Sequence, residues 1–226
     1  MTAGALTPMA RTVLFDLDGT LTDPFEGITR CHQHALERMG VRPIPAQAEL
    51  ARYIGPPLRR ALATLLGPGA TAADIERAVV HYRERFATVG LFENVVYDGV
   101  DAMLADLTAA GCRLYLATSK VHAYAVRILE HFALTRHFTA IYGTQPDGRF
   151  DDKADLLAHL LAEQGLPVDA TVMVGDREHD VLAAKRNGVR SIGVLWGYGT
   201  AAELTAAGAD VLCAAPGDLA RTVLAR

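Results

Sequence analysis

Cysteine is scarce in this chain of 226 residues, which has only Cys31, Cys112 and Cys213. The three cysteines lie far apart, and an odd number of them cannot pair completely. This pattern argues against a disulfide framework and is typical of proteins from a reducing compartment. We therefore expect the protein in the cytoplasm.

Long apolar runs are also missing. No stretch approaches the roughly 18 residues that a membrane-spanning helix needs. The first ten residues, MTAGALTPMA, lack the charged and apolar segments of a signal peptide. The net charge of -4 provides no general attraction to nucleic acid or to anionic membranes. These absences argue against a nucleic acid polymer or a membrane as the partner of the protein.

Lysine is the third scarce residue, because the chain has 19 arginines and only three lysines, Lys120, Lys153 and Lys185. A compact ammonium group differs from the planar fork of a guanidinium group, so the lysine at 153 is consistent with a site that needs the smaller cation, although Lys120 and Lys185 are equally rare. Lys153 and Lys120 lie next to other polar residues of interest, whereas Lys185 is expected on a solvated helix face.

Hydrophobic residues make up 50% of the chain, which is enough for a large core. Short apolar segments typical of buried strands alternate with helical patterns. The expected strands are residues 11–16, 112–118, 139–143, 171–175 and 190–195. The expected helices are residues 100–110, 122–132, 153–164 and 177–187. This alternation predicts an α/β fold with a parallel sheet covered on both faces.

One interval, residues 24–93, breaks the alternation, because it contains several helical patterns and no convincing strand. An insertion of roughly 70 residues is too long for an ordinary loop. We predict a small α-helical cap domain inserted after the first strand, with the cap at 23–94 and the core at 1–22 and 95–226. The expected hinges lie near residues 22–25 and 94–98.

The stretch VLFDLDGTLTD places Asp16 and Asp18 where the first expected strand ends. Side chains alternate along a strand, so these two carboxylates lean to the same side of the chain. In open α/β sheets, ligands bind beyond the carboxyl ends of the strands. Two carboxylates in such a place repel each other unless one is protonated or a cation lies between them.

Residues at the ends of the other expected strands supply further groups that suit a cation or a phosphate. Thr118 and Ser119 follow the next strand and offer donors to a phosphoryl oxygen. Asp176 follows a later strand, and Asp180 lies one helical turn further on. Lys153 opens another helix. Hard oxygen ligands at this density favour Mg²⁺, which is usually shared with a substrate phosphate.

The motifs DLDGT, LATS, DDK and GDREHD, in this order and spacing, resemble the four motifs of the haloacid dehalogenase superfamily, in its phosphatase branch. The resemblance covers essentially the whole chain. It implies a Rossmann-like, doubly wound core with a helical cap. It also implies that Asp16 is the nucleophile that becomes an aspartyl phosphate. Asp18 would protonate the leaving group and then deprotonate the hydrolytic water.

The resemblance implies the binding residues as well. Lys153 would take part in catalysis by neutralising the phosphoryl group, and the expected phosphate-binding residues are Gly19, Thr20, Thr118, Ser119 and Lys153. The expected Mg²⁺ ligands are Asp16, the backbone carbonyl of Asp18, Asp176 and, in support, Asp180. The partner would be a small phosphorylated metabolite, bound by a monomer or a small homo-oligomer.

Within the expected cap, the segment IGPPL is the best candidate to face the site. Gly55 permits close approach, and Arg59 is a candidate for contact with the substrate. Tyr82 and Phe86 are expected in the cap core rather than as a platform for stacking a base. Cys31 and His34 have a spacing that can bind zinc, but no second cluster accompanies them.

Several alternatives within the superfamily depend on single residues. Dehalogenases lack an aspartate at the position of Asp18, and phosphonate hydrolases need a cap lysine, which residues 24–93 lack. A sugar phosphomutase needs a second phosphate site in the cap, and Arg59, Arg60 or Arg83 would supply one. A non-catalytic relative that binds a phosphorylated ligand would be free to lose Asp18 or Lys153.

Among the phosphatases, the segments IGPPL, YRERF and GLFENVVYDGV, together with residues 172–200, resemble a bacterial 5'-nucleotidase-like subgroup. The alternative is a phosphoglycolate phosphatase or another small phosphomonoesterase.

Overall fold

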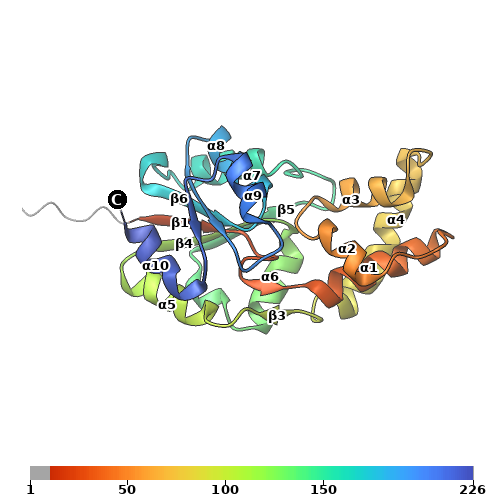
Figure 1. Ribbon diagram of the computed structural model, residues 1–226, viewed down its shortest axis with the longest axis horizontal. Helices are drawn as coiled ribbons and strands as arrows, with labels where there is room; N and C mark the ends of the chain where they lie inside the picture. The colour runs from red at the N-terminus through yellow and green to blue at the C-terminus, as the bar shows by residue number, and fades with distance from the viewer. Residues whose placement is uncertain (1–10, 226) are drawn as a thin grey trace, which may run out of the picture.

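A six-stranded parallel sheet lies at the centre of the protein, as a computed structural model that describes residues 11–225 shows (Figure 1). The segment MTAGALTPMA lies outside the described residues. The strands lie in the order β5-β4-β1-β6-β7-β8. Their bounds are Thr12–Phe15 for β1, Arg113–Val121 for β4, Ala140–Thr144 for β5, Thr171–Gly175 for β6, Arg190–Val194 for β7 and Val211–Cys213 for β8.

Helices cover both faces of this sheet, which explains why its strands are apolar throughout. Val13 and Phe15 of β1 pack on one side of the sheet, and Leu14 packs on the other. One face carries α5 (Val100–Ala109), α6 (His122–His131) and α10 (Pro216–Leu224). The other face carries α7 (Lys153–Glu163), α8 (Glu178–Arg186) and α9 (Ala201–Ala207). The predicted doubly wound α/β fold is confirmed.

A helical insertion follows β1, also as the sequence predicts, and forms the right-hand part of the molecule in Figure 1. Its α-helices are α1 (Phe25–Arg38), α2 (Gln47–Leu50), α3 (Leu58–Leu66) and α4 (Ala72–Arg85). Shorter turns follow α2 at Ala51–Tyr53 and α4 at Phe86–Gly90. The division into a core and a separately moving cap stays a prediction.

A two-stranded antiparallel ribbon joins the insertion to the sheet. Its strands are β2 (Thr22–Asp23) and β3 (Val95–Val96), with Thr22 opposite Val96. The ribbon coincides with the two expected hinges, although the sequence predicts no strand there. The two ends of the insertion are therefore held side by side.

The order of the strands places a switch point at β1. After β1 the chain builds β4 and β5 on one side, and it then returns to build β6, β7 and β8 on the other side. The carboxyl ends of β1, β4 and β6 meet at this point, which is where ligands bind in open α/β sheets. The helical insertion leaves the sheet from this same edge.

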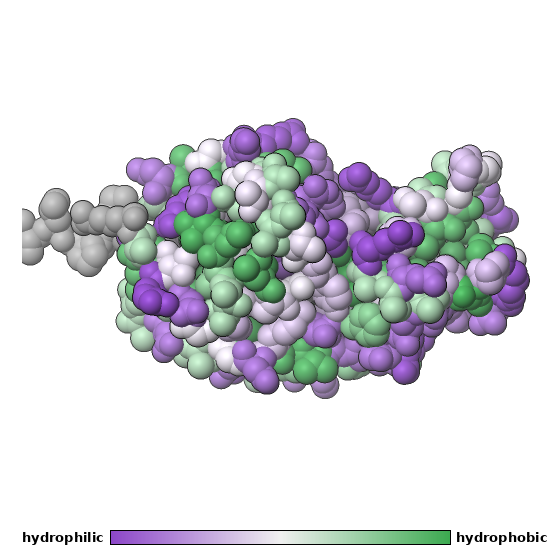
Figure 2. All heavy atoms as spheres, viewed as in Figure 1, coloured by the Kyte–Doolittle hydropathy of each residue, from purple (hydrophilic) through white to green (hydrophobic). Residues whose placement is uncertain are grey.

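None of the described helices is long and apolar enough to cross a membrane. On the face shown in Figure 2, hydrophilic side chains are interspersed with hydrophobic ones over both parts of the molecule.

Candidate active site

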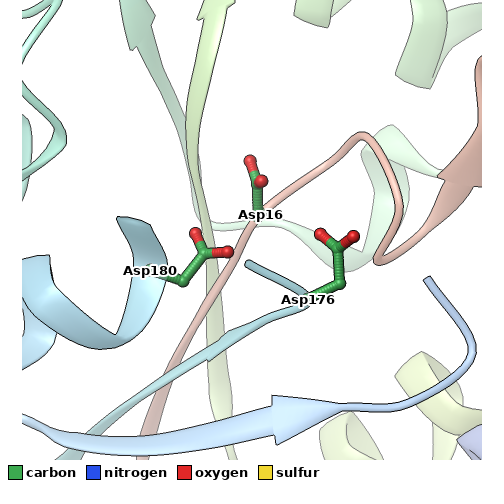
Figure 3. A group of neighbouring side chains, drawn as sticks. All are labelled: Asp16, Asp176 and Asp180. Carbon is green, nitrogen blue, oxygen red and sulfur yellow. The ribbon is translucent and has the colours of Figure 1, made fainter. Parts of the chain in front are cut away.

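Three aspartates converge at the switch point (Figure 3). Asp16 follows β1, Asp176 follows β6, and Asp180 lies in the first turn of α8. Each offers a carboxylate oxygen, and these oxygens lie within 4.8 Å of one another. All three side chains are buried, with Asp176 at 0% exposure. The structure thus brings together three of the acids that the sequence predicts as metal ligands.

The backbone around Asp176 holds its carboxylate in place. Gly19 has a φ of +82°, and a Cβ atom there would lie 2.2 Å from Asp176 Oδ2, so only glycine fits. The amide of Tyr198 donates to Asp176 Oδ2 at 2.8 Å. The hydroxyl of Thr20 donates to Asp176 Oδ1 at 3.4 Å. Gly19 and Thr20, predicted to bind phosphate, therefore lie against a carboxylate in this structure.

One ammonium group partly offsets the charge of the three acids. Lys153 Nζ lies 2.9 Å from Asp16 Oδ1 and also contacts Asp180. Burial alone would lower the pKa of Lys153, but Asp16 and Asp180 more than reverse that effect. Burial raises the pKa of Asp176 well above its usual value, and the charges of Asp180 and Asp16 raise it further. A divalent cation would relieve this repulsion.

The donor set fits such a cation. Three buried carboxylates offer only hard oxygen atoms, which is the chemistry that Mg²⁺ prefers, and no soft sulfur or imidazole ligand lies among them. The cluster is the only group of potential metal ligands found among residues 11–225. Cys31 and His34, whose spacing suits zinc, point to different partners: Cys31 contacts Arg85, and His34 contacts Glu84.

Asp18 forms an ion pair with a second lysine, Lys120. Lys120 Nζ lies 2.8 Å from Asp18 Oδ2, and the Lys120 side chain is only 6% exposed. The same ammonium group lies 4.5 Å from the centre of the Phe86 ring. Burial raises the pKa of Asp18, whereas Lys120 opposes that shift. The scarcity of lysine is the sequence signal for this residue, but its partner could not be assigned without the fold.

A cavity opens between these carboxylates and the helical insertion. On the sheet side it is lined by Asp16, Asp18, Thr118, Ser119 and Lys120. The predicted phosphate-binding residues Thr118 and Ser119 are thus placed beside the two acids. In the described chain Gly19, Thr20 and Lys153 do not line this cavity. Gly19 and Thr20 lie against Asp176, and Lys153 contacts Asp16.

The predicted cap residues Gly55 and Arg59 also line the cavity. Gly55 has a φ of +103°, and a Cβ atom there would lie 2.9 Å from Cγ of Arg177, a side chain that also donates to the Ile54 carbonyl. Gly55 therefore allows the insertion to approach α8 closely.

Arg59 joins the insertion to the loop that precedes α7. It pairs with Glu76 of α4 at 2.6 Å and with Asp151 at 3.3 Å, and it donates to the Pro146 carbonyl at 3.1 Å. These partners occupy its guanidinium group as the structure stands. Contact of Arg59 with a substrate stays a prediction.

Part of the cavity wall is aromatic. Tyr82 and Phe86 are buried, as expected for residues of the cap core, but they line the cavity as well. Trp196 and Tyr198 do not reach it in the described chain. Trp196 donates to the Thr20 carbonyl at 2.9 Å, and the Tyr198 hydroxyl donates to Asp23 in the ribbon.

A family model described as haloacid dehalogenase-like hydrolase matches residues 13–194 of this chain. A curated 5'-nucleotidase of Pseudomonas aeruginosa is 50% identical over 86% of each chain. A phosphoglycolate phosphatase of Agrobacterium fabrum is 35% identical, over 88% of this chain and 84% of that protein. The solved structure of a predicted phosphatase from Clostridium acetobutylicum superimposes with a TM-score of 0.91 at 37% identity, over 95% of this chain and 98% of that one.

Another relative has a different name. The tyrosine-protein kinase PtkA of Mycobacterium tuberculosis is 45% identical over 84% of this chain, and the match spans only 63% of that protein.

The chain belongs to the haloacid dehalogenase-like hydrolase family. It is an enzyme of the phosphatase type, as the motifs at the strand ends predict.

Proposed function

We propose that the protein is a Mg²⁺-dependent phosphomonoesterase that works through an aspartyl phosphate on Asp16. The observation that carries this proposal is that two neighbouring carboxylates pair with different lysines. Asp16 is paired with Lys153, and Asp18 is paired with Lys120. Two acids in one cavity with different partners are suited to different tasks.

Asp16 is the nucleophile in this proposal. Its carboxylate attacks phosphorus, the bond from phosphorus to the ester oxygen breaks, and an acyl phosphate forms on Asp16. Mg²⁺, when bound by Asp16, the Asp18 carbonyl, Asp176 and Asp180, would neutralise the phosphoryl charge. Lys153 keeps Asp16 oriented, and Thr118 and Ser119 offer donors to the phosphoryl oxygens.

Asp18 moves the proton. Its Oδ2 pairs with Lys120, whereas its Oδ1 is buried and has no hydrogen-bond partner among the described residues. The free oxygen belongs to a residue that lines the cavity, where a leaving group would lie. Protonated Asp18 gives its proton to the departing alkoxide, and the carboxylate then takes a proton from the water that hydrolyses the acyl phosphate.

Replacing Asp18 with Asn should slow hydrolysis of an alkyl phosphate by about 10²- to 10⁴-fold, the usual effect of removing an acid–base group. With p-nitrophenyl phosphate the leaving group needs no proton, so the first step should remain fast. Rapid-mixing assays should then show a burst of p-nitrophenol equal to the enzyme concentration, followed by slow turnover. The exposed Asp106→Asn variant on α5 is the matched control. Equal slowing of burst and turnover would contradict this role for Asp18.

We further propose a 5'-nucleotide as the substrate. The name of the Pseudomonas relative and the aromatic wall of the cavity support this choice over phosphoglycolate. The cavity measures about 80 Å³, far below the roughly 300–1,000 Å³ of pockets that hold larger ligands. The insertion would therefore act as a cap that opens at the β2–β3 ribbon to admit substrate.

The partner in this proposal is a small phosphorylated metabolite in the cytoplasm. The three cysteines are buried and unpaired, which is consistent with a reducing compartment.

The test is phosphate release from a panel of phosphomonoesters, measured with Mg²⁺ and with a chelator. The panel holds nucleoside 5'-monophosphates, ribose 5-phosphate, phosphoglycolate and a phosphotyrosine peptide. We expect metal-dependent turnover with a preference for nucleotides. A preference for phosphoglycolate would keep the mechanism and overturn the substrate, and turnover that survives the chelator would overturn the metal.

A further inference from the structure

A buried histidine in the cavity wall is not used by the proposed chemistry. His32 lies on α1, is 1% exposed and lines the same cavity as Asp16 and Asp18. Neither of its ring nitrogens makes a hydrogen bond of acceptable geometry among residues 11–225, although the Ile28 carbonyl lies near the ring. Leaving a buried polar group without a hydrogen-bond partner is unfavourable. A polar group kept in such a place suggests a partner that arrives from outside the chain.

The surroundings keep this imidazole uncharged. Burial lowers the pKa of His32 to about 4, and the Ile28 carbonyl, one helical turn earlier, opposes that shift only partly. At neutral pH the ring therefore offers one N–H donor and one lone-pair acceptor. Such a pair matches a neutral polar edge that has both a donor and an acceptor, whereas a carboxylate only accepts and would use only the N–H of the ring.

A row of aromatic rings connects His32 with the reacting end of the cavity. Lys120, the partner of Asp18, lies over the Phe86 ring at 4.5 Å. Phe86 stacks on Tyr82 with ring centres 5.5 Å apart, and Tyr82 lies 5.1 Å from the His32 ring. The Tyr53 ring is also near His32, with ring centres 6.2 Å apart. A flat ring packs favourably against such a wall.

Three cationic groups line the cavity, and each has a partner away from His32. Lys120 is paired with Asp18, and Arg59 is paired with Glu76 and Asp151. Arg83 forms no ion pair among the described residues and donates to the Pro146 carbonyl at 3.4 Å. The part of the wall around His32 therefore consists of aromatic surface with uncharged polar groups, which are the imidazole and the tyrosine hydroxyls. This chemistry matches a heteroaromatic ring that carries hydrogen-bonding groups on its edge.

We infer that His32 is a specificity-determining residue, which hydrogen-bonds the base of a nucleoside 5'-monophosphate while the Tyr82–Phe86 wall packs against the ring. This inference rests on the proposed function, and it adds the residue that distinguishes a nucleotide from the same phosphate ester without a base.

The experiment compares nucleoside 5'-monophosphates with ribose 5-phosphate, which has the same reacting end and no base. His32→Phe removes both hydrogen-bonding groups and keeps a flat ring. We expect kcat/KM for the nucleotides to fall by about 10-fold or more, mainly through KM, which corresponds to one lost buried hydrogen bond. The value for ribose 5-phosphate should change by less than about 2-fold.

Two further variants show which nitrogen acts. Asn places an amide near the position of Nδ1, and Gln places one near Nε2, so one of His32→Asn and His32→Gln should recover part of the selectivity. His34→Phe, on the opposite face of α1 and paired with Glu84, is the matched control and should leave the selectivity unchanged.

Two outcomes would overturn the inference. Unchanged selectivity in His32→Phe, with intact thermal unfolding, would mean that the base does not bind His32. An equal loss with ribose 5-phosphate would mean that His32 only supports the fold of the cavity.

Failure of the proposed function is a separate result. If the wild type hydrolyses nothing, calorimetric titration with the nucleotide and with ribose 5-phosphate still measures the preference for the base in wild type and His32→Phe. We expect that preference to shrink in the variant whether or not turnover occurs. The same preference in both proteins would contradict the inference.

Discussion

Replacing Asp16 with Asn is expected to lower the rate of phosphate release by on the order of 10⁴-fold or more, as removal of a covalent nucleophile does in other hydrolases. The amide cannot attack phosphorus, and it also removes one charge from the acidic cluster. Asp16 is buried beside Asp176 and Asp180, and Lys153 holds its Oδ1 at 2.9 Å. Steady-state assays over the whole panel of phosphomonoesters should show the loss with every substrate.

The control for this variant is again Asp106→Asn, which makes the same chemical change on the exposed surface of α5. It should retain wild-type rates. Circular dichroism and thermal unfolding should show that Asp16→Asn keeps the fold, because it lowers the repulsion among the three acids. An Asp16→Asn protein with more than about a tenth of the wild-type rate would contradict a nucleophilic role.

Replacing Lys153 with Met is expected to affect both stability and activity. Lys153 contacts Asp16 and Asp180, and its side chain is only 5% exposed. Removing one partner of a buried ion pair typically costs about 3–5 kcal/mol, because the remaining charges are left uncompensated. We expect urea denaturation with a chelator present to show a loss of that size, and phosphate release to fall by about 10³-fold or more.

Added Mg²⁺ should recover part of the lost stability, because a cation that binds the folded acids stabilises the folded state. Lys185→Met is the matched control: Lys185 is exposed on α8 and forms no ion pair in the described chain, so its loss should change stability by less than about 0.5 kcal/mol. Lys153→Arg keeps the charge with a larger group and should recover stability better than activity. A Lys153→Met protein as stable as the wild type would contradict the electrostatic account.

The acids at the strand ends can be predicted from the sequence because parallel strands share one edge. Asp16 follows the strand Thr12–Phe15, and Asp176 follows the strand Thr171–Gly175, so any parallel arrangement that makes these strands neighbours brings the two together. The insertion can be predicted equally well, since residues 24–93 contain helical patterns and no strand.

Strands of two or three residues cannot be predicted from such sequence patterns. The edge strand Val211–Cys213 has three residues, and the ribbon pairs two residues with two, so neither shows a period of alternation. The helix Pro216–Leu224, which follows this edge strand, is likewise absent from the elements that the sequence predicts.

The partners of single side chains are the other part that the sequence does not reveal. The position of Lys120 over Asp18 depends on how far β4 extends past Thr118, and β4 reaches Val121. On α1, Cys31 and His34 attract notice through their spacing, whereas His32 is the residue that lines the cavity. Which face of that helix meets the cavity depends on how the insertion packs against the sheet.

The most direct test of the central claim is chemical trapping of the acyl phosphate. Borohydride reduces an acyl phosphate to an alcohol, so an aspartyl phosphate on Asp16 would be converted to homoserine. The enzyme is quenched during turnover with substrate and Mg²⁺, reduced, digested and examined by mass spectrometry. The account predicts homoserine at position 16 only when both substrate and Mg²⁺ are present. Steady turnover without modification at position 16, or with modification at Asp18 instead, would contradict it.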